Sequence, residues 1–168
     1  WSFEALGAML WQRPLKDLGP ARQRVTPWIR ELLPLANHLA PIEWLRLALD
    51  RLPTGSPEDL VAGLGVALAL RRQPQAQPDP QADHVQEVAR MAGLTQPDGL
   101  RRYWVCVAEH GMNASTFTAR VVASTQAGER AAVSAALGAL QGPLHGGAPG
   151  PVLDMLDQLE QHPDPAAW

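Results

Sequence analysis

Two histidines in the last third of the chain stand between helical stretches, where a side chain can do chemistry. His110 precedes Gly111-Met112-Asn113, a polar junction at which Asn or Ser can cap the next helix. His145 lies in the run Gly142-Pro143-Leu144-His145-Gly146-Gly147-Ala148, where glycines permit unusual backbone angles and a close approach of a ligand. A histidine held in such a turn can act as an acid, a base or a hydrogen-bond donor. His145 is therefore the first candidate for a catalytic group.

Plainer structural interpretations of these residues stay open. A lone histidine such as His110 is more often a hydrogen-bonded structural residue than a ligand, and a helix cap alone would explain Asn113. The same reasoning favours a structural role for Cys106, which stands among apolar residues of a predicted helix and is expected to be a packed thiol. The glycine-flanked turn around His145 is harder to explain in this way.

The elements that position these side chains are predicted to be helices, because apolar residues recur at spacings of three and four. We expect helices over residues 2–11, 25–37, 42–52, 84–91, 114–125, 130–140 and 151–159. A further helix starts at Ser56-Pro57 and runs through 60–70, and another runs from Leu100 to an end at Gly111. No strand pattern or repeat is present, so the predicted fold class is all-α in one domain, residues 1–168.

Residue types also predict how these elements are buried. The stretch 60–70 is apolar on all sides, which predicts a buried helix. The stretches 114–125 and 130–140 are rich in small residues, which lets helix backbones approach closely and predicts packed inner helices. Residues 73–83 contain three prolines among polar residues and are predicted to be a surface linker.

Composition excludes several classes of protein. The net charge is -3, so neither a nucleic acid nor a membrane surface is an expected partner. The longest apolar run has 11 residues, Leu60 to Leu70, far from the roughly 20 that a membrane-spanning helix needs. A single cysteine, Cys106, allows no internal disulfide and no multi-cysteine zinc site, which favours a reducing cytoplasm. The chain starts on Trp1 without a secretory signal and ends on Trp168, as a fragment would.

Two runs of residues resemble the citrate synthase family. The run from Glu109 to Thr125, Glu-His-Gly-Met-Asn-Ala-Ser-Thr-Phe-Thr-Ala-Arg-Val-Val-Ala-Ser-Thr, is similar to the family's acid-His-x-x-Asn-Ala-Ser-Thr helix. The run from Gly138 to Ala148 is similar to its Gly-Pro-Leu-His-Gly-Gly-Ala turn, and the spacing between the two also agrees. The earlier helices resemble the family more loosely.

The resemblance implies a mostly helical, dimeric enzyme that condenses acetyl-CoA, or another short acyl-CoA, with oxaloacetate to give citrate and CoA, with no metal and no covalent cofactor. It implies that His145 donates a hydrogen bond to the thioester oxygen, which gains negative charge as the enolate forms. It further implies that His110, with Asn113 beside it, contacts oxaloacetate. Acyl-CoA contacts are implied for Leu144, Gly146 and Gly147.

The chain departs from the family pattern in two respects. The family's aspartate base, its second catalytic histidine and its oxaloacetate-binding arginines lie further toward the C-terminus than this sequence reaches, so we expect a large-domain portion that lacks the C-terminal part of the fold. Catalytic groups that act as a unit lose most of their effect when one is absent, so the 168 residues alone are expected to be inactive. In addition, Pro149-Gly150-Pro151 stands where the family usually has asparagine and an acid or amide.

Two functional hypotheses remain. In the first, the chain is part of a citrate synthase-like acyltransferase whose other catalytic residues lie in further sequence. In the second, it is a shortened, non-catalytic module for binding or assembly, with a possible partner chain that supplies the missing half. A helical interaction domain unrelated to the family is a more distant third hypothesis.

Overall fold

The computed structural model describes residues 1–15, 18–53, 55–146 and 149–161, and every regular element within these ranges is a helix. The all-α prediction is therefore confirmed for the described residues. In chain order the helices are α1 (Phe3–Trp11), α2 (Leu18–Ala36), α3 (Pro41–Asp50), α4 (Pro57–Arg72), α5 (His84–Met91), α6 (Pro97–Val107), α7 (Ala114–Ser124), α8 (Glu129–Leu140) and α9 (Pro149–Gln161).

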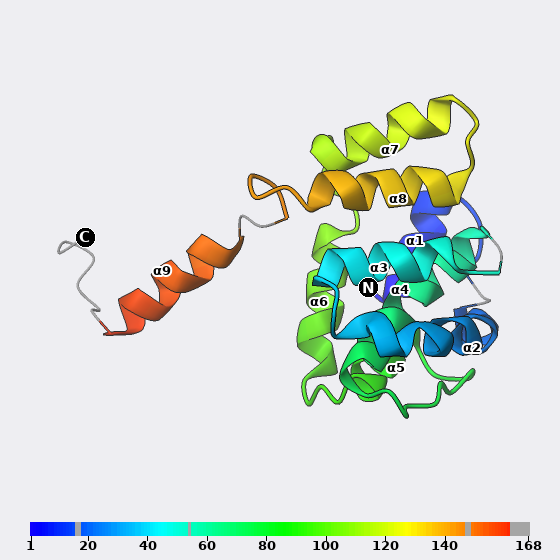
Figure 1. The fold of residues 1–168 in the computed structure, drawn as a ribbon, viewed down its shortest axis with the longest axis horizontal. Helices are drawn as coiled ribbons and strands as arrows, with labels where there is room; N and C mark the ends of the chain where they lie inside the picture. The colour runs from blue at the N-terminus through cyan, green and yellow to red at the C-terminus, as the bar shows by residue number, and fades with distance from the viewer. Residues whose placement is uncertain (16–17, 54, 147–148, 162–168) are drawn as a thin grey trace.

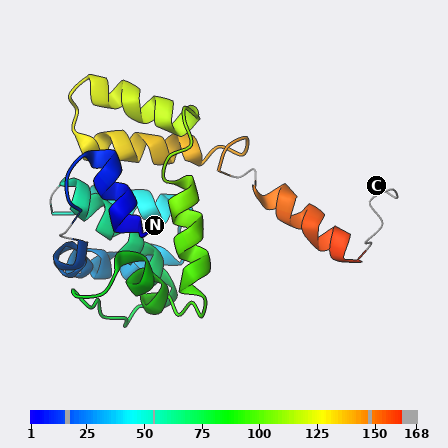
Figure 2. The same ribbon diagram turned by 180° about the vertical axis from the view of Figure 1, so that it is seen from behind.

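Helices α1 to α6 form a body on which α7 and α8 lie as an antiparallel pair, with α8 next to α3 (Figure 1). Helix α9 projects away from this body, and the view from behind shows the same separation (Figure 2). The turn that carries His145 therefore lies where the packed helices end and the projecting helix begins.

The hydrophobic core forms where α2, α3 and α4 meet. The Trp44 ring is fully buried, and its indole Nε1–H donates to the carbonyl oxygen of Ala67 at 2.9 Å, which satisfies its one polar atom. In α4, residues such as Val66 and Leu70 are fully buried, as their all-round apolar sequence predicts. Leu68 is an exception, with 40% of its surface exposed.

Serine side chains cap the first and fourth helices, α1 and α4. Ser2 Oγ accepts a hydrogen bond from the Ala5 amide at 3.1 Å, and Ser56 Oγ accepts from the Asp59 amide at 3.2 Å. Each cap satisfies one of the amide groups that a helix start leaves without an intrahelical partner.

The start of the second helix was predicted seven residues too late. The helix begins at Leu18 rather than at Val25, and it contains Pro27 and Pro34. A proline in the first turn of a helix breaks no hydrogen bond, because the first amides have no intrahelical acceptor, so Pro20 is compatible with a helix that starts at Leu18.

Arginine side chains hold the proline-rich loop between α4 and α5 by its backbone carbonyl groups. Arg22 donates to Asp79 and Ala82 at 2.8 and 2.7 Å. Two further arginines act in the same way: Arg30 donates to Ala76 O at 2.5 Å and Arg90 to Gln77 O at 2.6 Å. A guanidinium group carries several donors in one plane, which suits it to bind carbonyl groups that no helix satisfies.

The prediction that the two small-residue helices are inner helices is wrong. No residue of α7 is buried, and in α8 only Ala132 and Leu137 are buried. These helices pack against each other, and α8 also packs on α3, but one side of the pair faces solvent. Small side chains allow close packing without deciding how many neighbours a helix has.

Two expectations about α6 are also wrong. Cys106 is exposed rather than packed, because the side of α6 that carries Tyr103 and Val107 has no covering element among the described residues. The helix also ends at Val107, four residues before Gly111, although Gly111 has the positive φ of 80° that often follows a helix end.

Among the described residues, no helix is both long enough and apolar enough to cross a bilayer.

Candidate active site

The first side of the site is the start of α7, which Asn113 caps. Asn113 has extended backbone angles, and its Oδ1 accepts a hydrogen bond from the Thr116 amide at 2.8 Å. The same oxygen accepts a second hydrogen bond from the Ser115 hydroxyl at 2.8 Å. The capping role predicted for Asn113 is confirmed, and the cap also fixes the direction of the Ser115 hydroxyl.

The second side of the site is the turn that follows α8. The His145 amide donates to Gly142 O at 3.0 Å, and the Gly146 amide donates to Leu140 O at 2.9 Å. A Cβ atom on residue 146 would lie only 2.1 Å from Leu140 O, so this close approach requires glycine. The tight turn holds the half-buried His145 ring at the end of α8.

A hydrogen bond joins the two sides. His145 Nε2 lies 2.9 Å from Ser115 Oγ. While the Ser115 hydroxyl donates its hydrogen to Asn113 Oδ1, the serine oxygen accepts from the histidine. The geometry therefore assigns the proton to Nε2 in this arrangement and leaves Nδ1 as the atom available to a ligand.

His110 joins the same network from the other end. The Asn113 side-chain amide nitrogen lies 3.3 Å from His110 Nε2, and the His110 side chain is exposed. The same amide nitrogen lies 3.4 Å from His110 Nδ1, and because Nδ2 of Asn113 can only donate, one of the two ring nitrogens accepts from it. The polar atoms of His110, Asn113, Ser115 and His145 thus form one continuous chain between the two turns.

A cavity opens beside His145. It has a volume of about 470 Å³ and is lined by His145, Pro149, Val152 and Leu153. Its wall is the start of α9, where Pro149 carries no backbone N–H and presents an apolar ring beside Val152 and Leu153. A ligand that reaches His145 through this cavity meets one polar ring and an otherwise apolar surface.

The three residues predicted to contact acyl-CoA are found in different situations. Leu144 is 97% exposed, so its side chain is free to contact a ligand or another chain. The backbone of Gly146 closes the turn, as described above. Gly147 lies outside the described residues.

Sequence reasoning missed Ser115 and the α9 side chains of the cavity. Ser115 lies two residues after the recognised Asn113, but only the fold brings it to His145, 30 residues later in the chain. The described residues contain no group of three or more acidic, histidine or cysteine side chains placed to bind a metal ion.

The family model described as "Citrate synthase, C-terminal domain" matches residues 45–168. The 2-methylcitrate synthase of Mycobacterium tuberculosis (strain ATCC 25618 / H37Rv) is 31% identical over 189 residues, which covers 93% of this chain and 48% of that protein. In the same organism, a protein described as putative citrate synthase 2 is 63% identical over 67 residues, or 40% of this chain and 18% of its own length.

A solved structure has a similar fold. The crystal structure of citrate synthase from Thermotoga maritima MSB8 superposes with a TM-score of 0.71 at 27% sequence identity, covering 94% of this chain and 50% of the other. The chain therefore spans about half the length of the relatives that it matches almost from end to end.

Proposed function

This chain belongs to the citrate synthase family, and from that membership we propose that its protein is an acyltransferase that condenses acetyl-CoA, or another short acyl-CoA, with oxaloacetate and releases CoA. One observation carries the proposal beyond the family: His145 is fixed through Nε2 on Ser115 and borders an apolar cavity. This arrangement suits a thioester whose carbonyl oxygen gains negative charge, because a fixed ring can donate to that oxygen.

His145 has the role of an electrophilic donor in this proposal. When the carbon next to the thioester carbonyl loses a proton, negative charge moves to the carbonyl oxygen, and a fixed donor lowers the energy of that charge. For Nδ1 to donate, the ring proton must be on Nδ1. Ser115 can support that form by turning its hydroxyl toward Nε2, while Asn113 Oδ1 keeps its hydrogen bond from the Thr116 amide.

His110 and Asn113 are proposed to bind the second substrate. Oxaloacetate carries two carboxylates and a ketone, all of which are hydrogen-bond acceptors, and the side chains of His110 and Asn113 both carry donors or can gain one. Their exposed or half-buried position next to the His145 network supports this role. Leu144, Gly146 and Gly147 are proposed to contact the acyl-CoA.

The remaining catalytic groups are proposed to come from polypeptide outside these 168 residues, either in the same protein or in a partner chain. The half-length match to the relatives supports this view. We also propose that the chain alone is inactive, that the protein forms a homodimer and that it is located in the cytoplasm. An interface with another chain is supported by three exposed apolar residues, which are Met112 just before α7 and Phe117 and Val121 within it.

The test is condensation activity of the full-length protein, measured as release of CoA thiol from acetyl-CoA and oxaloacetate. Replacing His145 with alanine should lower the rate about 10²–10³-fold, which is the usual effect of removing one oxyanion donor. His38→Ala, at an exposed histidine of the body, is the matched control and should keep the wild-type rate. Equal rates in His145→Ala and wild type would remove His145 from the mechanism.

A non-catalytic module is the second candidate, and the half-length match is the observation that favours it. An intact mass near 18.2 kDa, with no thiol release in the presence of both substrates, would support this candidate. A mass of roughly twice that value with activity would support the enzyme.

A further inference from the structure

The first helix is held to the body by few groups, and one of them is a carboxylate in an unusual position. No residue of α1 is fully buried. Glu4 on α1 reaches the start of α5, where its Oε1 accepts a hydrogen bond from the His84 amide at 2.7 Å. The other oxygen, Oε2, is buried, and no donor among the described residues bonds to it. A buried carboxylate oxygen without a donor is costly if it is charged.

A second carboxylate lies next to the His84 amide that Glu4 binds, because Asp83 directly precedes His84. Asp83 caps α5, and its Oδ1 accepts from the amides of Val85 and Gln86, both at 3.1 Å. Both amides bind the same Asp83 oxygen, so this side chain presents hydrogen-bond acceptors to Glu4. One oxygen of Glu4 accepts a hydrogen bond from the His84 amide, whereas the other, Oε2, has no donor. A proton shared between the two side chains therefore belongs on Glu4 Oε2, from which it can donate to Asp83.

The arginine side chains nearby do not supply the donor that Glu4 Oε2 lacks. Arg22 of α2 attracts Glu4 at a distance, but it directs its Nη atoms at His84 Nδ1 and at two loop carbonyls. Arg101 of α6 pairs with Asp98 and donates to the Trp1 carbonyl at 3.3 Å.

One further acidic side chain, Glu87, lies in the first turn of the helix that Asp83 caps. Glu87 of α5 accepts from Arg90 and from the Asp79 amide. In agreement with this arrangement, burial and the hydrogen bond with Asp83 raise the pKa of Glu4 above its usual value.

The rest of the α1 contact is loosely packed. Phe3 lies against the rings of His84 and Trp104, with centroid distances of 5.8 and 5.5 Å. Farther along α1, a cavity of about 220 Å³ lies under Leu6, Leu10 and Trp11. An incompletely filled contact gains less dispersion energy than a close-packed one, so the polar contacts of Glu4 matter more for holding α1.

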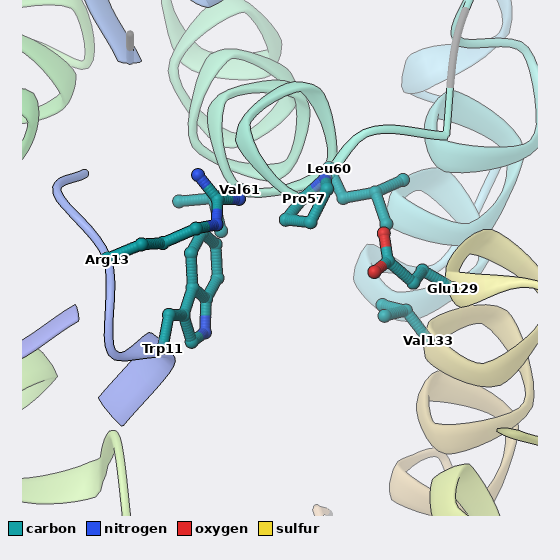
Figure 3. A pocket seen from close by; sticks show the side chains of 7 residues that line it. All are labelled: Trp11, Arg13, Pro57, Leu60, Val61, Glu129 and Val133. Carbon is teal, nitrogen blue, oxygen red and sulfur yellow. The ribbon is translucent and has the colours of Figure 1, made fainter. Parts of the chain in front are cut away.

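The end of α1 also forms one wall of a larger cavity. This cavity has a volume of about 440 Å³, with Trp11 and Arg13 on one side, Glu129 and Val133 of α8 on the other, and Pro57 and Leu60 of α4 between them (Figure 3). The Arg13 guanidinium lies 5.1 Å from the centre of the Trp11 ring and pairs with Glu58. A movement of α1 would therefore open this cavity.

We propose that α1 is a proton-dependent latch: Glu4 and Asp83 share one proton while α1 is docked, and loss of that proton as the pH rises loosens α1 from α5 and opens the cavity beside Trp11. The direction of this pH dependence follows from the linkage between protonation of Glu4 and docking of α1. Docking favours the protonated form of Glu4, so its contribution is complete in acid and is lost as the pH rises through the pKa of the docked state. Each unit by which docking shifts that pKa changes the docking equilibrium about tenfold.

The test is hydrogen exchange of the α1 amides in the full chain, expressed as protection factors from about pH 4.5 to about pH 8. The α4 amides serve as an internal reference for the folded body. In wild type, protection of α1 should fall about tenfold or more relative to α4 as the pH rises. In Glu4→Gln the side-chain amide can donate to Asp83 permanently, while its oxygen still accepts from His84, so α1 protection should not change with pH.

Glu43→Gln is the matched control, because Glu43 also accepts a backbone amide at a helix start but is exposed to solvent. This variant should keep the wild-type pH dependence of α1. The proposal is overturned if wild-type α1 shows the same protection across the range, if it is unprotected throughout, or if Glu4→Gln retains the wild-type fall. A loss of α1 protection in Glu4→Gln in acid, with α4 still protected, would also contradict it.

Discussion

The Nε2 atom of His145 lies 2.9 Å from the hydroxyl oxygen of Ser115, and this hydrogen bond joins the turn after α8 to the first turn of α7. It is the contact that makes one site from two separate stretches of sequence. Because Ser115 is itself oriented by Asn113, the position of the His145 ring depends on a helix cap.

We predict that Ser115→Ala lowers the rate of condensation while leaving the fold intact. The substitution removes one hydrogen bond to the ring, and a net loss of about 1 kcal/mol corresponds to a rate decrease of about fivefold. Thiol release at saturating oxaloacetate measures the effect. Ser124→Ala, at the other end of α7, is the control, since its hydroxyl bonds only to the Val121 carbonyl. A normal rate in Ser115→Ala would show that the hydrogen bond is not needed for catalysis.

A second prediction concerns the glycines of the turn. Gly146→Ala would place a Cβ atom 2.1 Å from Leu140 O and should destabilise the folded state by about 1–3 kcal/mol, because the turn must open to make room. Gly142→Ala is the paired control, with its nearest neighbour at 3.5 Å, an ordinary contact. Urea unfolding compares the two variants. If both lose the same stability, the close approach at Gly146 is not a structural requirement.

The buried His84 predicts how stability depends on pH. Burial, and then the nearby Arg22, lower the pKa of His84 from 6.5 to about 3. Since the unfolded chain binds this proton at a higher pH than the folded chain, stability decreases as the pH falls from 6.5 toward 3, by at most about 1.4 kcal/mol per pH unit.

Replacing His84 with glutamine should remove the contribution of this ring to the change in unfolding free energy with pH, whatever the effect of the substitution on stability at neutral pH. The free energy of unfolding in urea, measured at several pH values between about 4 and 6, gives the slope for each variant. His38→Gln, at an exposed histidine, should keep the wild-type slope. Identical slopes in wild type and His84→Gln would contradict the assignment of a depressed pKa to this ring.

The sequence alone determined the local features of this protein. Helical spacing and the caps at Ser2, Ser56 and Asn113 depend on residues within one or two turns of each other, so they can be read without knowledge of the fold. The motif around His145 and the family resemblance are local in the same sense. For this reason the helix class and the candidate residues could be predicted.

The tertiary structure decided what depends on contacts between distant residues. Periodicity shows which side of a helix is apolar, but not whether another element covers it, so the exposure of Cys106 and of α7 could not be predicted. The partners of Ser115 and of Glu4 lie 30 and 80 residues away in sequence. Hydrogen bonds of this range depend on how the helices pack, which is a property of the whole chain rather than of any segment.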